Sequence, residues 1–248
     1  MKVSRVRHQI HRRRRQWGLS LIEIFVGITI GLFLLAGLVT IFASTRQNSF
    51  AQSQLAQLQD DQRMAMNMLT TIIQQAGYYP TPQSMTAATA LPLVSPFVQA
   101  GQSITGTTTV GSNSDTIAVR YVASVAGTTS TDAIINCNGA ANTSPTTTAT
   151  YVNIFSLDSQ NQLNCAVNAN TAQPLVGGIS GINILYGVDP DSNGSVNQYY
   201  LASNMTTALW TSVISVRITV TFNNPLYGQP GQLQTIPFTR VISLMNRS

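Results

Sequence analysis

The chain has 248 residues, a formal net charge of +5 and 8% charged residues. Both histidines, His8 and His11, and the one lysine, Lys2, lie within the first 18 positions. The rest of the chain therefore cannot build a Ser-His-Asp triad, a Cys-His pair or a Ser-Lys dyad. It also has no imidazole to bind zinc or non-haem iron. We therefore expect that the protein is not an enzyme.

The basic residues are concentrated at the N-terminus. Seven of the thirteen precede Gly18, four of them in the run Arg12–Arg15. After Gly18, six arginines stand against eight acids, which gives a net charge of −2. A high isoelectric point normally raises the question of a nucleic-acid partner. Here it comes from the N-terminal segment, so we expect no such partner.

An uncharged apolar stretch of 22 residues runs from Ile24 to Thr45. As a helix it would be about 33 Å long, which matches a hydrocarbon core of roughly 30 Å. A basic flank, here Arg12–Arg15, marks the cytoplasmic side of such a segment. The pattern predicts a single membrane span that leaves the cytoplasm in the N-to-C direction.

Two residues distinguish this segment from a cleaved secretory signal. A secretory signal has small residues after its apolar core. Here the small residue, Gly18, precedes the core, and an acid, Glu23, lies at the core's N-terminal edge. The segment resembles the prepilin signature of type IV pilins and type II secretion pseudopilins. The resemblance rests on the basic leader, on Gly18, on the sequence Leu19-Ser20-Leu21-Ile22-Glu23 and on the apolar run that follows.

The resemblance implies a processing pathway and a location. A prepilin peptidase would cut after Gly18 and remove residues 1–18, and the new N-terminal residue, Leu19, would be methylated. Glu23 would be the assembly glutamate. The protein would be anchored in the inner membrane, with its C-terminal domain in the periplasm, and would enter a filament after processing.

Two features of the first turns have more than one interpretation. Ser20 and Glu23 also fit an S-x-x-E capping box, which stabilises a single helix and needs no neighbouring subunit. Gly27 and Gly31 form a G-x-x-x-G pattern, which allows close helix packing in membranes but is also common by chance in apolar runs.

The helical period continues beyond the membrane segment. Apolar residues recur on one face, at Leu55, Leu58, Ala65, Leu69, Ile72 and Ala76. The opposite face is polar, so the pattern predicts an amphipathic second half. Gly77 stands where a helix ends. We expect an N-terminal helix within residues 19–76, its membrane part at about 24–45, and then a proline-rich connector over residues 77–101 without regular structure.

Residues 102–248 show strand patterns separated by Thr/Ser-rich loops. The clearest alternation runs from Ile214 to Phe222. Other expected strands are Thr116–Val122, Tyr151–Leu157, Gly181–Val188, Val196–Ala202 and Ile236–Met245. Residues 106–114 and 140–150 are expected to be loops. The fold class is therefore α+β: a long helix packed on one periplasmic, mainly antiparallel β domain.

The domain contains the chain's two cysteines, Cys137 and Cys165. In an oxidising compartment, two cysteines indicate one disulfide. The alternative is a pair of buried, unpaired thiols.

An acidic loop offers the one candidate metal site. Asp189, Asp191 and Asn193 alternate before Gly194, as at the start of an EF-hand calcium loop. The bidentate glutamate of such a loop would fall at Tyr200. The alternative is a β-hairpin loop in which Asn193-Gly194 supplies the turn. We expect no cofactor other than this possible calcium.

Four segments narrow the resemblance to the PilW-type minor pilins: Gln75–Tyr78, Leu185–Val196, Val213–Thr221 and Ile242–Arg247. That resemblance implies a minor pilin that primes or joins assembly of a type IV pilus, with prepilin peptidase, other minor pilins and the major pilin as partners. Twitching motility and cell adhesion would be downstream roles. The alternatives are a type II secretion pseudopilin and a single-span periplasmic binding protein or adhesin outside any filament.

Overall fold

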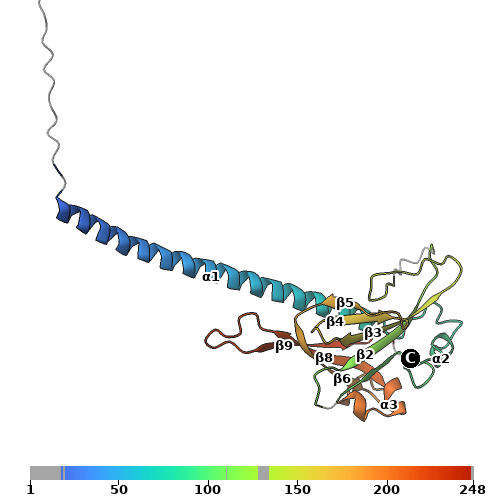
Figure 1. The fold of residues 1–248 in the computed structure, drawn as a ribbon. Coiled ribbons are helices and arrows are strands. Elements are labelled where there is room, and N and C mark those ends of the chain that lie inside the picture. The colour runs from blue at the N-terminus through green and yellow to red at the C-terminus, as the bar shows by residue number, and fades with distance from the viewer. Residues whose placement is uncertain (1–17, 19, 110, 128–133, 247–248) are drawn as a thin grey trace, which may run out of the picture. The chain divides into compact units, whose positions relative to one another are not determined.

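The computed structural model describes residues 18, 20–109, 111–127 and 134–246. The chain forms two compact units, Met1–Phe50 and Ala51–Ser248. Helix α1, Leu21–Gln74, belongs to both units, because their boundary falls inside it (Figure 1). The helix expected within residues 19–76 is therefore confirmed, with slightly shorter ends.

Helix α1 ends where a residue without a Cβ is required. Gly77 has a φ of +78°, a conformation that side chains disfavour, and its N–H donates to the carbonyl of Arg120 at 3.0 Å. A Cβ at Gly77 would lie 2.8 Å from the carbonyl oxygen of Asn246. The glycine thus ends the helix and also lets the chain pass close to the C-terminal segment.

The connector contains a short helix, α2, Ala87–Ala90, where the sequence predicted no regular structure. Two threonines produce it. The N–H of Thr89 donates to the Thr86 hydroxyl, and the N–H of Thr86 donates to the Thr89 hydroxyl at 2.9 Å. This reciprocal capping box satisfies two backbone donors and nucleates one turn between the prolines.

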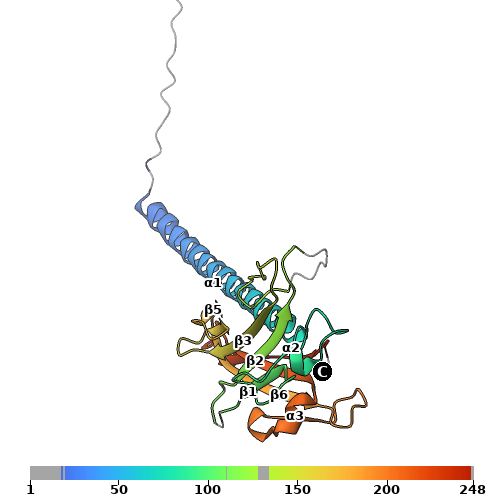
Figure 2. The same cartoon turned by 90° about the vertical axis from the view of Figure 1, so that its right-hand side faces the viewer.

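The β domain has two antiparallel sheets (Figure 1, Figure 2). The first has the order β1-β2-β3-β4-β5 and the second the order β7-β6-β8-β9. The first sheet contains β1 (Ile104–Thr107), β2 (Thr116–Ala123), β3 (Ala149–Leu157), β4 (Leu163–Val167) and β5 (Gln173–Val176). The second contains β6 (Ile179–Val188), β7 (Gln198–Tyr200), β8 (Val213–Asn223) and β9 (Thr235–Ser243). A 3-10 turn, η1 (Ala202–Asn204), and a short helix, α3 (Thr207–Thr211), lie between β7 and β8.

The six strands expected from the sequence are all present, although β7 is shorter than expected. Strands β1, β4 and β5 were not predicted. Each has four or five residues, too few to establish an alternating pattern against a Thr- and Asn-rich background. The loop predicted at residues 106–114 is wrong at its start, because Gly106 and Thr107 pair with β2.

A buried acid lies where the two sheets meet. Ser114 and Ile182 form a short parallel bridge, and beside it the Asp115 carboxylate accepts the Ile184 N–H at 2.7 Å. Asp115 is 1% exposed, and burial raises the pKa of its carboxyl group. This contact fixes the start of β2 against the middle of β6.

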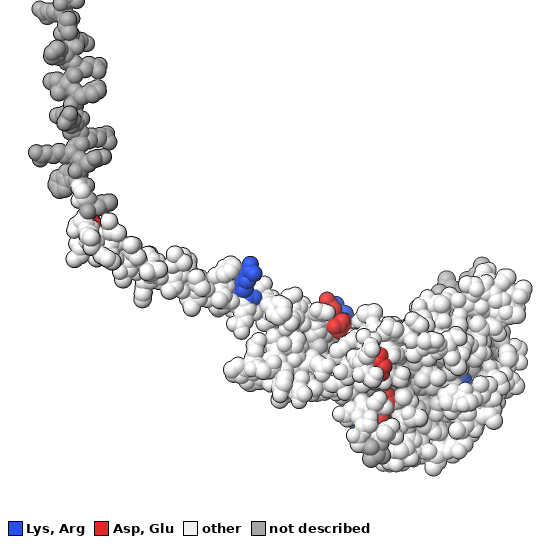
Figure 3. Space-filling model, viewed as in Figure 1, with Lys and Arg blue, Asp and Glu red and all other residues white. Residues whose placement is uncertain are grey.

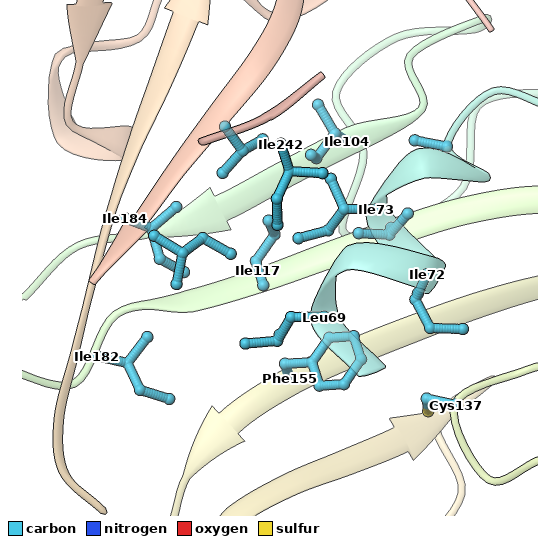
Figure 4. Close-up of a cluster of buried hydrophobic side chains, with 14 of the residues drawn as sticks. Leu69, Ile72, Ile73, Ile104, Ile117, Cys137, Phe155, Ile182, Ile184 and Ile242 are labelled. Carbon is cyan, nitrogen blue, oxygen red and sulfur yellow. The ribbon is translucent and has the colours of Figure 1, made fainter. Parts of the chain in front are cut away.

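The apolar stripe of α1 forms the centre of the core. Leu58, Ala65, Leu69, Ile72 and Ala76, all on the predicted face, are buried, and Leu55 packs against the same cluster. Figure 4 shows Ile73 among Ile104, Ile117 and Ile242, which come from both sheets. The C-terminal part of the helix therefore holds the two sheets around one hydrophobic cluster.

We expect Ile73→Ala to lower the free energy of unfolding by about 2–5 kcal/mol, because the side chain is fully buried and its removal leaves a cavity. Met64→Ala is the matched control, since Met64 lies on the same helix and is 50% exposed. Urea unfolding of the full-length protein in detergent measures both. Equal losses in the two variants would contradict the central position of Ile73.

Candidate functional site

The first part of α1 is apolar on every side. Its large hydrophobic side chains from Leu21 to Phe42 are between 49% and 82% exposed. A helix that is hydrophobic all round normally lies in lipid or inside a large protein core. This is the one helix in the described chain that is long and apolar enough to cross a membrane, so it is consistent with a single membrane anchor.

The threonine hydroxyl groups in this segment are satisfied within the helix. Thr29 donates to the carbonyl of Phe25 at 2.7 Å, and Thr45 donates to the carbonyl of Ile41 at 2.9 Å. Thr40 donates to the carbonyls of Ala36 and Gly37. A polar group in hydrocarbon costs free energy unless it is hydrogen-bonded. These threonines therefore do not prevent the segment from lying in lipid.

The predicted processing residues lie at the start of this helix. Gly18 is exposed and precedes α1, whereas Leu19, the predicted methylated residue, lies outside the described residues. Glu23 is in the first turn, and its N–H donates to the Ser20 carbonyl at 2.9 Å. A carboxylate in the first turn is favoured by the helix dipole. This location is compatible both with helix capping and with a contact to a second subunit.

The chain itself gives no reason for glycine at positions 27 and 31. A Cβ built at Gly27 or at Gly31 meets nothing within 4 Å, and neither residue has a positive φ. Alanine would also favour the helix more strongly than glycine does. Any packing benefit of the G-x-x-x-G pattern must therefore come from another molecule.

The predicted disulfide is present between Cys137 and Cys165, whose Cα atoms are 6.3 Å apart. Cys165 lies in β4, and Cys137 lies in the long connection between β2 and β3. Two hydrogen bonds reinforce the junction: the Tyr121 hydroxyl donates to the carbonyl of Ile135 at 2.6 Å, and the Cys137 N–H donates to Asn153 Oδ1 at 2.8 Å. The disulfide thus attaches this connection to the first sheet.

The acidic loop joins β6 to β7 in an antiparallel hairpin, as its hairpin interpretation predicted. Asp189 is buried, and its two carboxylate oxygens accept the N–H groups of Asn193 at 3.0 Å and of Gly194 at 2.7 Å. Asn193 Oδ1 accepts the Ser195 N–H at 2.8 Å. These side chains therefore organise the loop through its own backbone, and Gly194 supplies a φ of +88°.

Asp191 lies close to Asp189 in the same loop. Hydrogen bonding to the Asp189 side chain and to Asn197 lowers the pKa of the Asp191 carboxyl group. Asn193 Nδ2 donates to Asp191 Oδ2 at 2.9 Å. Among the described residues, no group of three or more His, Cys, Asp or Glu side chains is arranged to hold a metal ion. The structure thus brings the three predicted calcium ligands together, with their oxygens engaged in loop hydrogen bonds.

The sequence interpretation missed a buried arginine in β2. Arg120 is 1% exposed, and its guanidinium stacks on the Phe97 ring at 4.1 Å from the ring centroid. It donates four hydrogen bonds to backbone carbonyls: three in the connector, those of Leu91, Pro92 and Gln99, and that of Gln102 just after it. The available signal was a charged residue inside the otherwise apolar strand pattern of residues 117–123.

Charge is sparse on the surface shown in Figure 3, where a few charged residues are separated by wide uncharged areas. An antiparallel β domain joined to one long apolar helix defines the class of protein: a β-rich domain on a single candidate membrane anchor.

Within this class, residues 156–235 match the family model PilW, described as Type IV Pilus-assembly protein W. The match runs from the end of β3 to the start of β9 and includes the acidic loop. The match covers less than half of the chain, and over these residues the chain is similar to a PilW-type pilus protein, a family described by its part in type IV pilus assembly. No curated protein and no solved structure matches the chain.

Replacing both Cys137 and Cys165 by alanine should lower the free energy of unfolding by about 3–4 kcal/mol, because the bridge closes a loop of 28 positions. Urea unfolding measures the loss, and wild-type protein treated with a reductant should show a similar one. Two free thiols in denatured, unreduced wild-type protein would contradict the bond.

We also predict that the Asp189 carboxylate stabilises the folded protein. Asp189→Ala should lower the melting temperature, because two backbone N–H groups lose their acceptor. Leaving one buried donor without a partner costs about 1–3 kcal/mol. Asp191→Ala, at an exposed position, is the matched control and should have a smaller effect. Millimolar calcium should leave the wild-type melting temperature unchanged. A calcium-dependent rise that both variants abolish would instead identify a calcium site.

Proposed function

We propose that the protein is a minor pilin that primes or joins assembly of a type IV pilus. One observation carries the proposal: the helix preceded by Gly18 exposes apolar side chains on all sides over a membrane-spanning length, and it continues into a domain that matches the PilW family model. A helix of this kind can pass from lipid into a filament core without exposing its apolar surface to water.

Processing at the N-terminus completes the proposal. Prepilin peptidase cuts between Gly18 and Leu19, and the new amine of Leu19 is methylated. The domain of residues 51–248 lies in the periplasm, and the helix anchors it in the inner membrane before incorporation. The prepilin-like order of basic leader, Gly18 and apolar core supports these steps.

The proposed role is structural and needs no catalytic residue, metal or cofactor. Its partners are prepilin peptidase, the major pilin and other minor pilins. The family match favours the pilus over a type II secretion pseudopilus, because the matched family is named for type IV pilus assembly. Twitching motility and adhesion would follow from the filament and not from a separate active site.

Glu23 is proposed to pair with the Leu19 amine of a neighbouring subunit. A carboxylate at the centre of a membrane helix costs roughly 2.5–3.5 kcal/mol and less near the edge, so such residues usually have a partner. In a low dielectric, attraction between the carboxylate and the ammonium group is strong and would help to set the register between adjacent helices.

The variant Glu23→Gln separates this pairing from helix capping, because glutamine preserves the capping box and removes the charge. The pairing predicts that the variant is produced and cleaved normally but is poorly recruited into pili. Immunoblots of sheared pili against whole cells measure recruitment.

Mass spectrometry provides the control for processing in the same cells. Wild type and Glu23→Gln should both begin at methylated Leu19. An intact Met1 form in peptidase-positive cells would reject the processing step. Wild-type recruitment of a correctly cleaved Gln variant would leave only the capping role for Glu23.

A further inference from the structure

A cavity of about 370 Å³ lies against the first sheet, on the face opposite the core. It is lined by Arg120 in β2 and by residues of the connector, of β3 and of the turn after β4: Pro92, Val94, Ser95, Pro96, Thr150, Val152, Ile154, Asn168 and Ala169. Successive strand residues point to opposite faces, so Arg120 lies on the outer face while its neighbours Val119 and Tyr121 lie in the core. The volume of the cavity falls within the range of protein ligand sites.

The cavity has apolar walls and one cationic group. Val94, Val152 and Ile154 supply aliphatic side chains, and Arg120 supplies the positive charge. Four of the five guanidinium N–H bonds donate to carbonyl oxygens, which leaves one N–H on Nη1. Among the residues that the structure describes, no carboxylate forms an ion pair with this guanidinium.

Among the described residues, the charge of Arg120 is therefore held by hydrogen bonds to carbonyl groups and is paired with no carboxylate. Burial lowers its pKa to about 10, so the group stays protonated at neutral pH. Carbonyl oxygens carry partial charges, and a buried ion normally has a counter-ion as well as hydrogen bonds. A carboxylate that enters the cavity would supply the missing negative charge and would accept a charge-assisted hydrogen bond.

The connector segment that lines the cavity also carries exposed apolar side chains. Leu93 is 62% exposed, Val94 is 53% exposed and Val98 is 52% exposed, and all three belong to the connector segment that Arg120 holds in place. Contiguous exposed apolar residues on a soluble domain often mark a protein-binding surface. A small ligand inside the cavity would leave these side chains uncovered, whereas a polypeptide segment would cover them.

We propose that this cavity binds a polypeptide segment of a partner protein in which an acidic side chain lies between apolar residues. The acidic side chain enters the cavity toward Arg120, and the apolar neighbours pack on Val152, Ile154 and the exposed connector side chains. The site is on the β domain and does not involve the N-terminal helix, so it stands or falls separately from processing and filament entry.

Fluorescence polarisation tests the proposal with the full-length protein in detergent. The probe is a fluorescein-labelled pentapeptide with a central glutamate flanked by two valines on each side, and the matched probe has glutamine at the centre. We expect the glutamate peptide to bind at least about tenfold more tightly, as a charged hydrogen bond in a sheltered site would give. Equal affinities for the two peptides would overturn the proposal.

A variant at the cavity wall avoids removing Arg120, which also organises the connector. Ile154→Asp should weaken binding of the glutamate peptide by about tenfold, because the introduced carboxylate would repel the glutamate of the peptide. Val241→Asp, at a 53% exposed position on β9 outside the cavity lining, is the matched control and should bind as wild type does. Equal weakening in both variants, at unchanged melting temperatures, would reject this location.

Octanoate distinguishes a polypeptide partner from a free aliphatic carboxylate. We expect millimolar octanoate to displace the glutamate peptide weakly, because it cannot cover the exposed connector side chains Leu93, Val94 and Val98. Displacement by octanoate at concentrations equal to those of unlabelled peptide would assign the cavity to a small carboxylate ligand and overturn the polypeptide assignment.

Discussion

Burial of one helical stripe is the interaction on which the β domain depends. Residues from Leu58 to Ala76 of α1 place their apolar side chains between two sheets that share few direct hydrogen bonds with each other. Each sheet is antiparallel and needs one covered face to be stable in water. Because the helix contributes to the core of both, loss of its packing would expose the inner faces of both sheets at once. The domain is therefore built around the same element that continues into the candidate membrane anchor.

A disulfide and side-chain hydrogen bonds stabilise the connections between strands. The Cys137–Cys165 disulfide and the Asn153 side chain attach the long β2–β3 connection, the Asp189 carboxylate closes the β6–β7 loop, and Arg120 collects carbonyl groups of the connector. Backbone groups in such Thr- and Ser-rich segments lack regular partners, so side chains must satisfy them. This explains why Arg120 and Asp189 are buried although they are charged, whereas the buried Asp115 bonds to strand β6.

The two parts of helix α1 are suited to different surroundings. The first part of α1 has exposed apolar side chains on every face, and its threonine hydroxyls are bonded to the helix backbone, which suits an apolar environment. The second part has one apolar face and a polar opposite face, which suits a domain surface. The distribution of apolar residues around the helix, and not the secondary structure, separates the two parts.

The sequence by itself determined the helix, its membrane-length apolar segment, its buried face and the longer strands, because these depend on residue periodicity over many positions. It also indicated the disulfide, since two cysteines allow one pairing. The tertiary structure alone decided the division into two sheets, the short strands β1, β4 and β5, and the burial of Arg120. Short strands take their pairing from distant neighbours, and the environment of Arg120 is made by carbonyls that lie 18 to 29 positions away along the chain. Contacts of that kind leave no local pattern in the order of residues.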